Sequence, residues 1–220
     1  MSVLKTIKCK NCGERGTPKN NSTLGYYCEK EACQDARIEK ALKKVRQSTE
    51  AATKKANVEW NKERKQMMER LKSLADWKND LQADVNLIAR LIDKGCPCIA
   101  TGKYQGKMAG GHFIAVGANA TIRFNLLNIH LQSFHSNSWK GGDNLRYRDG
   151  LVVMYGKDYL DEVEALKSTP AIHLNIDETR RAISVAKKII KELKAADETY
   201  TPGERIELRK KYNEQLGIYK

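Results

Sequence analysis

One histidine and two asparagines in the middle of the chain have residue types and a spacing that suit phosphodiester hydrolysis. His112 follows two glycines and opens a β-branched run. Asn128 lies in a second apolar run after fifteen intervening residues, and Asn137 follows after eight more. An imidazole can deprotonate water near neutral pH, and a nearby cation can stabilise the charge that develops on a phosphate. We therefore predict a hydrolytic site on a strand–turn–strand–helix unit.

The same spacing is that of the HNH, or ββα-metal, nuclease site, and this similarity implies a role for each residue. His112 would be the general base, Asn128 would tie the loop between the strands, and Asn137 would ligate a catalytic Mg²⁺ or Mn²⁺. His130 and His135 are further candidates for a metal or leaving-group contact. Taken singly, each residue has an ordinary explanation, because lone strand histidines and turn asparagines are commonly structural.

The charge of the chain favours a polyanionic partner. Its 220 residues carry a net charge of +13, and residues 35–72 hold the largest share, with twelve Lys and Arg against six Asp and Glu. Binding of nucleic acid to such a surface would release counterions from the phosphates. A solvated charged surface is the alternative explanation. Four basic residues near the predicted site are candidates for phosphate contacts: Arg123, Lys140, Arg146 and Arg148.

Four of the six cysteines are arranged as metal ligands rather than as disulfide partners. Cys9 and Cys12 form a CxxC pair, and Gly13 follows directly. Cys28 and Cys33 form a second pair after a fifteen-residue loop. Four thiolates satisfy tetrahedral Zn²⁺ and leave no open position for catalysis, and so short a polar stretch needs the metal to fold. We predict a structural zinc module; reduced, unligated thiols are the alternative.

Helical periodicity surrounds the predicted site. Residues 35–74 lack proline and glycine and repeat apolar or small side chains at steps of three and four, which predicts one long amphipathic helix. A second helix is expected to start at Asp76 and to end at Gly95. Further helices are expected at 145–155, 158–166, 177–196 and from a capping box at Thr201 to about Leu216. The predicted fold class is α+β and mainly helical, with a small ββα-metal core.

Five short motifs in the middle of the chain belong to one known pattern: Asp76-Trp77, Cys98-Ile99-x-x-Gly102, Gly111-His112-Phe113-Ile114, Leu126-Leu127-Asn128-Ile129-His130-x-Gln132 and Asn144-Leu145-x-Tyr147-Arg148-x-Gly150-Leu151. Through them the chain resembles the NinG/Rap recombination proteins of lambda-type phages. The similarity is strongest from residue 76 to 167, and the N-terminal cysteines and the polar helix also fit that family's layout. It implies an HNH-like nuclease that cleaves branched recombination intermediates, such as Holliday junctions and D-loops, with a divalent cation.

A second zinc site of that family is missing from this sequence. The family has one CxxC before the histidine and another after the second strand. Here the corresponding positions are Cys98 and Thr101, then Ser133 and Ser136. We predict that this zinc is not bound and that apolar packing replaces it, through Phe113, Ile122, Phe124, Leu126, Leu127 and Ile129.

Two further features concern metal binding near the predicted site. Many HNH sites place an aspartate directly before the histidine as a metal ligand, and Gly111 occupies that position here. Cys96, Cys98 and His135 are a candidate for a different metal site.

The resemblance and the patterns together predict four segments and leave three functions open. The segments are a zinc-binding module at 1–34, a long basic helix at 35–75, an HNH-like nuclease core at 76–168 and a helical region at 169–220. The functions are a structure-selective endonuclease, a non-catalytic DNA-binding recombination accessory protein with a degenerate HNH fold, and an RNA- or ribosome-associated zinc protein.

The expected location is the cytoplasm, and the expected assembly is a homodimer. No segment approaches the run of about 18 apolar residues that a membrane helix needs, and the N-terminus lacks a signal-peptide pattern. We therefore expect a soluble protein without a membrane partner, in the host cell if a phage encodes it. A homodimer, formed through the long helix, would supply the two active sites that symmetric cleavage of a junction requires.

Overall fold

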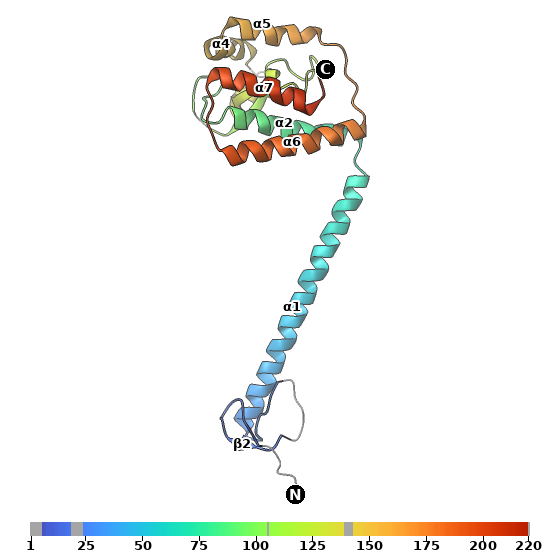
Figure 1. The fold of residues 1–220 in the computed structure, drawn as a ribbon, viewed down its shortest axis with the longest axis vertical. Helices are drawn as coiled ribbons and strands as arrows, with labels where there is room; N and C mark the ends of the chain where they lie inside the picture. The colour runs from blue at the N-terminus through green and yellow to red at the C-terminus, as the bar shows by residue number, and fades with distance from the viewer. Residues whose placement is uncertain (1–5, 19–23, 105, 139–142, 220) are drawn as a thin grey trace. The chain divides into compact units, whose positions relative to one another are not determined.

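The computed structural model describes residues 6–18, 24–104, 106–138 and 143–219. The chain divides into two compact units, Met1–Leu71 and Lys72–Lys220. Helices make up most of both, and the strands that are described form two sheets of two strands each (Figure 1). The prediction of a mainly helical α+β fold is thus confirmed. Among the described helices, none has an apolar stretch long enough to cross a membrane.

The first unit consists of a short hairpin, a cysteine cluster and one long helix. Strand β1 (Ile7–Lys8) pairs antiparallel with β2 (Arg15–Gly16). Helix α1 (Glu31–Arg70) is the predicted long helix, and it begins four residues earlier than expected. Its forty residues span about 60 Å at about 1.5 Å per residue. Cys33 is the one buried residue of α1. Because so little of α1 packs against other elements of its unit, its own backbone hydrogen bonds are its main stabilisation.

Helix α2 (Leu74–Ile92) is the centre of one hydrophobic core in the second unit. It packs against α6 (Ile176–Ala196), α7 (Pro202–Leu216) and the start of β4 (Ile129–Ser133). The apolar face predicted for α2 is buried as expected: Trp77, Leu81, Val85, Ile88 and Ile92.

The start of α2 differs from the prediction by three residues. Ser73 is the N-cap, and its hydroxyl accepts a hydrogen bond from the Asp76 backbone N–H. The Asp76 carboxylate in turn accepts from the Ser73 N–H. Asp76 is therefore the N3 residue of a capping box rather than the cap itself.

A second hydrophobic core forms where α4 (Asn144–Tyr155) and α5 (Lys157–Ala165) pack against residues 98–100, 113–114, 122 and 127, which flank the hairpin of β3 (Met108–His112) and β4. The break between these helices is at Gly156, with φ +88°, which lies between the two helices expected at 145–155 and 158–166. At Gly150, α4 approaches the Ile99 carbonyl so closely that an added Cβ would overlap it. The apolar residues predicted to replace a second zinc are all buried: Phe113, Ile122, Phe124, Leu126, Leu127 and Ile129.

Strand β3 ends at His112 rather than beginning there. The β-branched run after His112 predicted a strand, but Phe113 and Ile114 are both buried, whereas neighbours in a half-buried strand point to opposite faces. The Asn128 side chain also forms hydrogen bonds with both the backbone N–H and the carbonyl of Ile114. No strand partner is then needed, and residues 113–125 form a loop.

The C-terminal helices belong to the same unit as the hairpin. Helices α6 and α7 contribute eight of the eighteen buried residues in the α2 core, and Asn213 on α7 hydrogen-bonds to the Leu126 N–H and to Asn125. The sequence-based division at 168/169 therefore separates segments that share a core. Short helices α3 (Phe134–Ser138), η1 (Leu126–Asn128) and η3 (Leu166–Ser168) complete the described elements of this unit.

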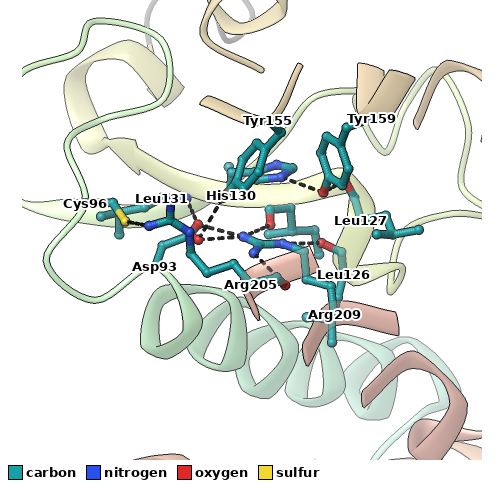
Figure 2. Close-up of polar contacts among 12 residues, drawn as sticks. Asp93, Cys96, Leu126, Leu127, His130, Leu131, Tyr155, Tyr159, Arg205 and Arg209 are labelled. Atoms are coloured by element: carbon teal, nitrogen blue, oxygen red, sulfur yellow. Dashed lines mark hydrogen bonds and ion pairs between the residues drawn. The ribbon is translucent and has the colours of Figure 1, made fainter. Parts of the chain in front are cut away.

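A buried ion pair joins α2, β4 and α7 (Figure 2). Asp93 follows the last residue of α2, and Arg209 lies on α7; their side chains are 2% and 0% exposed. One Arg209 Nη lies 2.7 Å from both Asp93 carboxylate oxygens. Asp93 also accepts from the Leu131 N–H of β4, and Arg209 donates to the Leu126 carbonyl. The pair thus fixes the end of α2 to the chain at two points: at Leu126, where η1 begins, and at Leu131 in β4.

Aromatic and sulfur groups surround this ion pair. The Tyr155 hydroxyl of α4 donates to Asp93 at 3.3 Å, and the guanidinium groups of Arg205 and Arg209 lie over the Tyr155 ring. Arg205 also donates to the Cys96 sulfur. Because burial raises the pKa of the Cys96 thiol, this sulfur accepts as a neutral group.

Replacing Asp93 by Asn should destabilise the second unit by about 3–5 kcal/mol, because the Arg209 charge would stay buried without its partner. Urea unfolding measures the loss. Asp161→Asn is the matched control, since the Lys157–Asp161 pair is exposed on α5 and exposed pairs contribute little. Equal stability of the two variants would contradict the structural role of the pair.

Candidate functional site

The His112 ring is half-buried at the end of β3, and one of its nitrogens is engaged by the backbone. His112 Nε2 lies 2.9 Å from the Arg123 carbonyl oxygen. A carbonyl can only accept, so Nε2 carries the hydrogen in the neutral ring, and Nδ1 keeps the lone pair. The local geometry therefore selects Nδ1 as the basic nitrogen.

The surroundings of His112 keep the ring neutral. Burial lowers its pKa, the hydrogen bond to the Arg123 carbonyl raises it, and the Arg123 charge lowers it. The net effect is a pKa below the usual value near 6.5. At pH 7 the imidazole is consequently in the form that can accept a proton.

Arg123 is held beside His112 by two polar side chains of α2. Its Nε donates to Gln82 at 3.0 Å, and one Nη donates to Asn79 at 2.8 Å. Gln82 Nε2 also donates a hydrogen bond to Asn86 Oδ1 at 2.7 Å. Sequence reasoning missed this polar row, whose signal is its spacing of three and four residues along a helix that otherwise buries apolar side chains.

Asn128 fixes the loop that follows His112. It is fully buried, its Oδ1 accepts from the Ile114 N–H at 2.8 Å, and its Nδ2 donates to the Ile114 carbonyl at 3.0 Å. The Phe113 N–H donates to the Asn128 carbonyl at 2.9 Å. These three bonds tie the chain directly after His112 to the start of β4.

The glycine before His112 has no space for a side chain. A Cβ on Gly111 would overlap the Gln132 side chain, so a metal-binding aspartate does not fit there in this packing. The Gly111 carbonyl accepts from the Tyr147 hydroxyl at 2.9 Å. Helix α4 thereby holds the backbone next to His112.

His130 is buried, and its contacts are those of a structural residue. Its Nδ1 is 3.1 Å from the Tyr147 hydroxyl and its Nε2 is 2.9 Å from the Tyr159 hydroxyl. Burial, followed by the charges of Arg209 and Arg205, lowers its pKa well below the usual value. Both ring nitrogens are thus occupied, and this geometry offers no free nitrogen for a cation.

The other predicted site residues lie on or after α3, away from the His112 end of the hairpin. His135 and Asn137 are exposed on α3. The Phe134 N–H at its start bonds to the Lys107 carbonyl, beside the Met108–Ser133 end of the ladder. His112 is at the opposite end, about 13 Å along the strands, and no hydrogen bond joins it to Asn137 in the described structure. Lys140 lies outside the described residues.

Arg146 and Arg148 are exposed on the first two turns of α4. Arg146 lies 3.6 Å from Asp143, and Arg148 lies 3.4 Å from Glu164. Such surface pairs are weak, so both guanidinium groups are available to an anionic ligand.

The four positions that would hold a second zinc are joined by hydrogen bonds instead. The Ser133 N–H donates to the Cys98 sulfur at 3.2 Å, and the Ser133 and Ser136 hydroxyls are 3.0 Å apart. Burial raises the pKa of Cys98, but hydrogen bonds, foremost from Thr101, outweigh it and lower that pKa. The metal site considered for Cys96, Cys98 and His135 does not form among the described residues.

The four N-terminal cysteines do converge. The sulfur atoms of Cys9, Cys12, Cys28 and Cys33 all lie within 4.8 Å of one another. Gly13 has φ +75°, which a glycine adopts without strain, and its N–H bonds to the Cys9 carbonyl. The predicted cluster is confirmed, and it could hold a structural metal ion such as zinc.

Backbone hydrogen bonds prepare the Cys9 thiol of this cluster for a cation, whereas the pKa values of Cys12 and Cys28 are raised. Burial raises the pKa of the Cys9 thiol, but N–H groups of Cys12, Cys28 and Asn11 outweigh it and lower the pKa to about 6. The Cys28 N–H lies 3.3 Å from the Cys9 sulfur, and Asn11 Nδ2 lies 3.5 Å from the Cys33 sulfur. Donors aimed at sulfur are typical of the surroundings of bound thiolates.

Comparisons with known proteins point to one phage family. The family model described as Bacteriophage Lambda NinG protein matches residues 1–197. Protein ninG of Escherichia phage lambda is 33% identical over 96 residues, which is 43% of this chain and 47% of the relative. Protein ninG of Salmonella phage P22 is 32% identical over 96 residues, with the same two shares. These alignments span about half the length of the relatives. No solved structure gives a significant match.

Removing one ligand should abolish zinc binding at the cysteine cluster. Elemental analysis should find about one zinc per chain in the unaltered protein and almost none in Cys12→Ala, because three thiolates hold the ion less tightly. Cys96→Ser is the matched control, since Cys96 lies in the other unit. Full zinc content in Cys12→Ala, or its loss in Cys96→Ser, would refute the assignment.

Proposed function

Because this chain belongs to the bacteriophage lambda NinG family, we propose that it is a metal-dependent endonuclease that cleaves branched DNA, such as a Holliday junction or a D-loop. The observation that carries the proposal is the state of His112. Its Nε2–H is bound to the Arg123 carbonyl, and its lowered pKa keeps Nδ1 unprotonated at neutral pH. This is the preparation that a general base requires.

In the proposed reaction, His112 Nδ1 takes a proton from water as the water oxygen attacks phosphorus. A new P–O bond forms, the bond to one bridging oxygen of the phosphodiester breaks, and the leaving oxygen takes up a proton. The Arg123 guanidinium, held by Asn79 and Gln82, uses two of its five N–H groups in those bonds. Its positive charge beside His112 would stabilise the negative charge that grows on the phosphate.

The donors of α3 are of the right type for a cation, but they lie away from His112. Mg²⁺ usually keeps several waters and takes only one or two protein ligands together with phosphate oxygens. The Asn137 amide oxygen and the His135 imidazole are exposed on α3, about 13 Å along the strands from His112, so they would hold a cation on a phosphate other than the one that reacts at His112. A Mg²⁺ or Mn²⁺ ion on the reacting phosphate would be held there by phosphate oxygens and water, and it would neutralise charge on that phosphate.

Exposed arginines of α4 would contact the DNA backbone beyond the reacting phosphate. Arg146 and Arg148 would exchange their weak partners, Asp143 and Glu164, for phosphate oxygens. Arginine binds phosphate through two parallel N–H groups, which is stronger than a single exposed ion pair.

Replacing His112 by Ala should slow single-turnover cleavage of a synthetic four-way junction, with Mg²⁺ or Mn²⁺, by about 10²–10⁴-fold. Junction affinity should stay nearly unchanged, because the phosphate contacts remain. The matched control is His173→Ala, since His173 is exposed and lies before α6.

Two outcomes would contradict the proposal in different ways. Equal cleavage by His112→Ala and by the unaltered protein would show that His112 takes no part in the chemistry. Tight junction binding without cleavage by either protein would instead support a non-catalytic recombination accessory protein.

A further inference from the structure

Most basic residues of α1 lie on one side of the helix. At about 100° per residue, eight Lys and Arg fall within an arc of about 120°. All of them are exposed, and the only acidic residue on that arc is Glu69, which follows the last of them. The face comprises Arg37, Lys40, Lys43, Lys44, Lys54, Lys55, Lys62 and Lys65; we call it the basic face of α1.

The rest of α1 shows that this segregation is a property of the whole helix. The opposite side carries an exposed apolar stripe with Ile38, Leu42, Val45, Trp60 and Met67. Acidic residues lie mainly beside that stripe. A helix that was merely solvated would mix both signs around its circumference.

The charges of the basic face are largely not neutralised within the chain. In the described part of the protein, Lys62 pairs with Glu59 at 3.7 Å, and Lys40 lies over the Tyr27 ring. None of the other six residues forms an ion pair among the described residues. Their counterions are therefore those of the solvent, which a polyanion displaces with a gain in entropy.

The basic residues fall into three groups whose spacing matches duplex DNA. The group from Arg37 to Lys44 is centred about 20 Å from Lys54 and Lys55, and about 34 Å from Lys62 and Lys65. One turn of B-DNA is about 34–36 Å long, and it is divided into a wide major groove and a narrow minor groove. Successive groups are about 20 Å and then about 14 Å apart along the helix, an unequal division like that of the wide and narrow grooves.

We propose that the basic face of α1 binds the phosphate backbones of duplex DNA, with the helix along the duplex axis for one turn. Each group of basic residues then meets one crossing of a strand. The contact reads no bases, because Lys and Arg on this face meet phosphates only. It does not depend on His112 or on cleavage, so α1 would hold an arm of any DNA that contains B-form duplex.

The test compares two double variants that remove the same charge from the same helix. Lys44→Gln/Lys55→Gln alters the basic face, whereas Arg46→Gln/Arg64→Gln alters positions about 60° or more outside it. Gln is a good helix former, so both variants should keep α1, as circular dichroism can verify. The probe is an unbranched 20-base-pair DNA duplex, with no added Mg²⁺ or Mn²⁺, titrated by fluorescence anisotropy over a salt series.

The basic-face variant should lose about tenfold or more in affinity near 0.1 M salt, and its slope of log K against log salt should be shallower by roughly 1.8, for two lost phosphate contacts. The control variant should change both quantities much less. An equal loss in both variants would show a general charge effect and overturn the proposal.

A 20-base-pair RNA duplex separates the two kinds of nucleic acid. Its A-form grooves have a different spacing, so the basic-face substitutions should reduce RNA affinity less than DNA affinity. An equal or larger loss with RNA would overturn the assignment to duplex DNA. Unbranched duplex binding is measured without cleavage, so its failure is distinct from a failure of the nuclease proposal.

Discussion

The buried pair between Asp93 and Arg209 is the constraint on which the second unit depends. Two charges removed from water cost several kcal/mol each unless their hydrogen bonds are satisfied. Here Asp93 accepts a hydrogen bond from the Leu131 N–H of β4, and Arg209 donates to the carbonyl of Leu126 in η1, which precedes β4. Because β4 is the strand that pairs with His112, the position of the candidate base is set by an ion pair that spans 116 residues of sequence.

Local signals in the sequence predicted the helices and the cysteine cluster well. The apolar face of α2, the break at Gly156 and the capping box at Thr201 each depend on residues within a few positions of one another. The cysteine cluster was predictable because thiolate spacing is itself a metal signature. The start of α2 was misplaced because Ser73 and Asp76 share one capping box, and only the outer residue is the cap.

Long-range polar partners could not be predicted in the same way. Arginines on a polar helix are usually exposed, yet Arg205 and Arg209 are both buried. The partner of His112 is a backbone carbonyl, which carries no residue-type signal. The row of Asn79 and Gln82 is recognisable only once Arg123 is seen beside it.

Hydrogen bonds link the positions that the resemblance assigns to a second zinc. Cys98 still accepts a backbone N–H from Ser133, and the serine hydroxyls bond to each other. The surrounding apolar residues are buried. Packing and hydrogen bonds thus hold the hairpin, while the cysteine cluster of the first unit keeps a complete set of four ligands.

The central claim is that His112 is a neutral base whose Nδ1 is unprotonated, and ¹⁵N NMR of the histidine rings tests it most directly. Spectra of the ¹⁵N-histidine-labelled protein from pH 5 to 8, assigned with His112→Gln, report the tautomer and the pKa. We predict the Nε2–H tautomer at pH 7, and a pKa below the usual value near 6.5. An Nδ1–H tautomer, or a protonated ring at pH 7, would contradict the account.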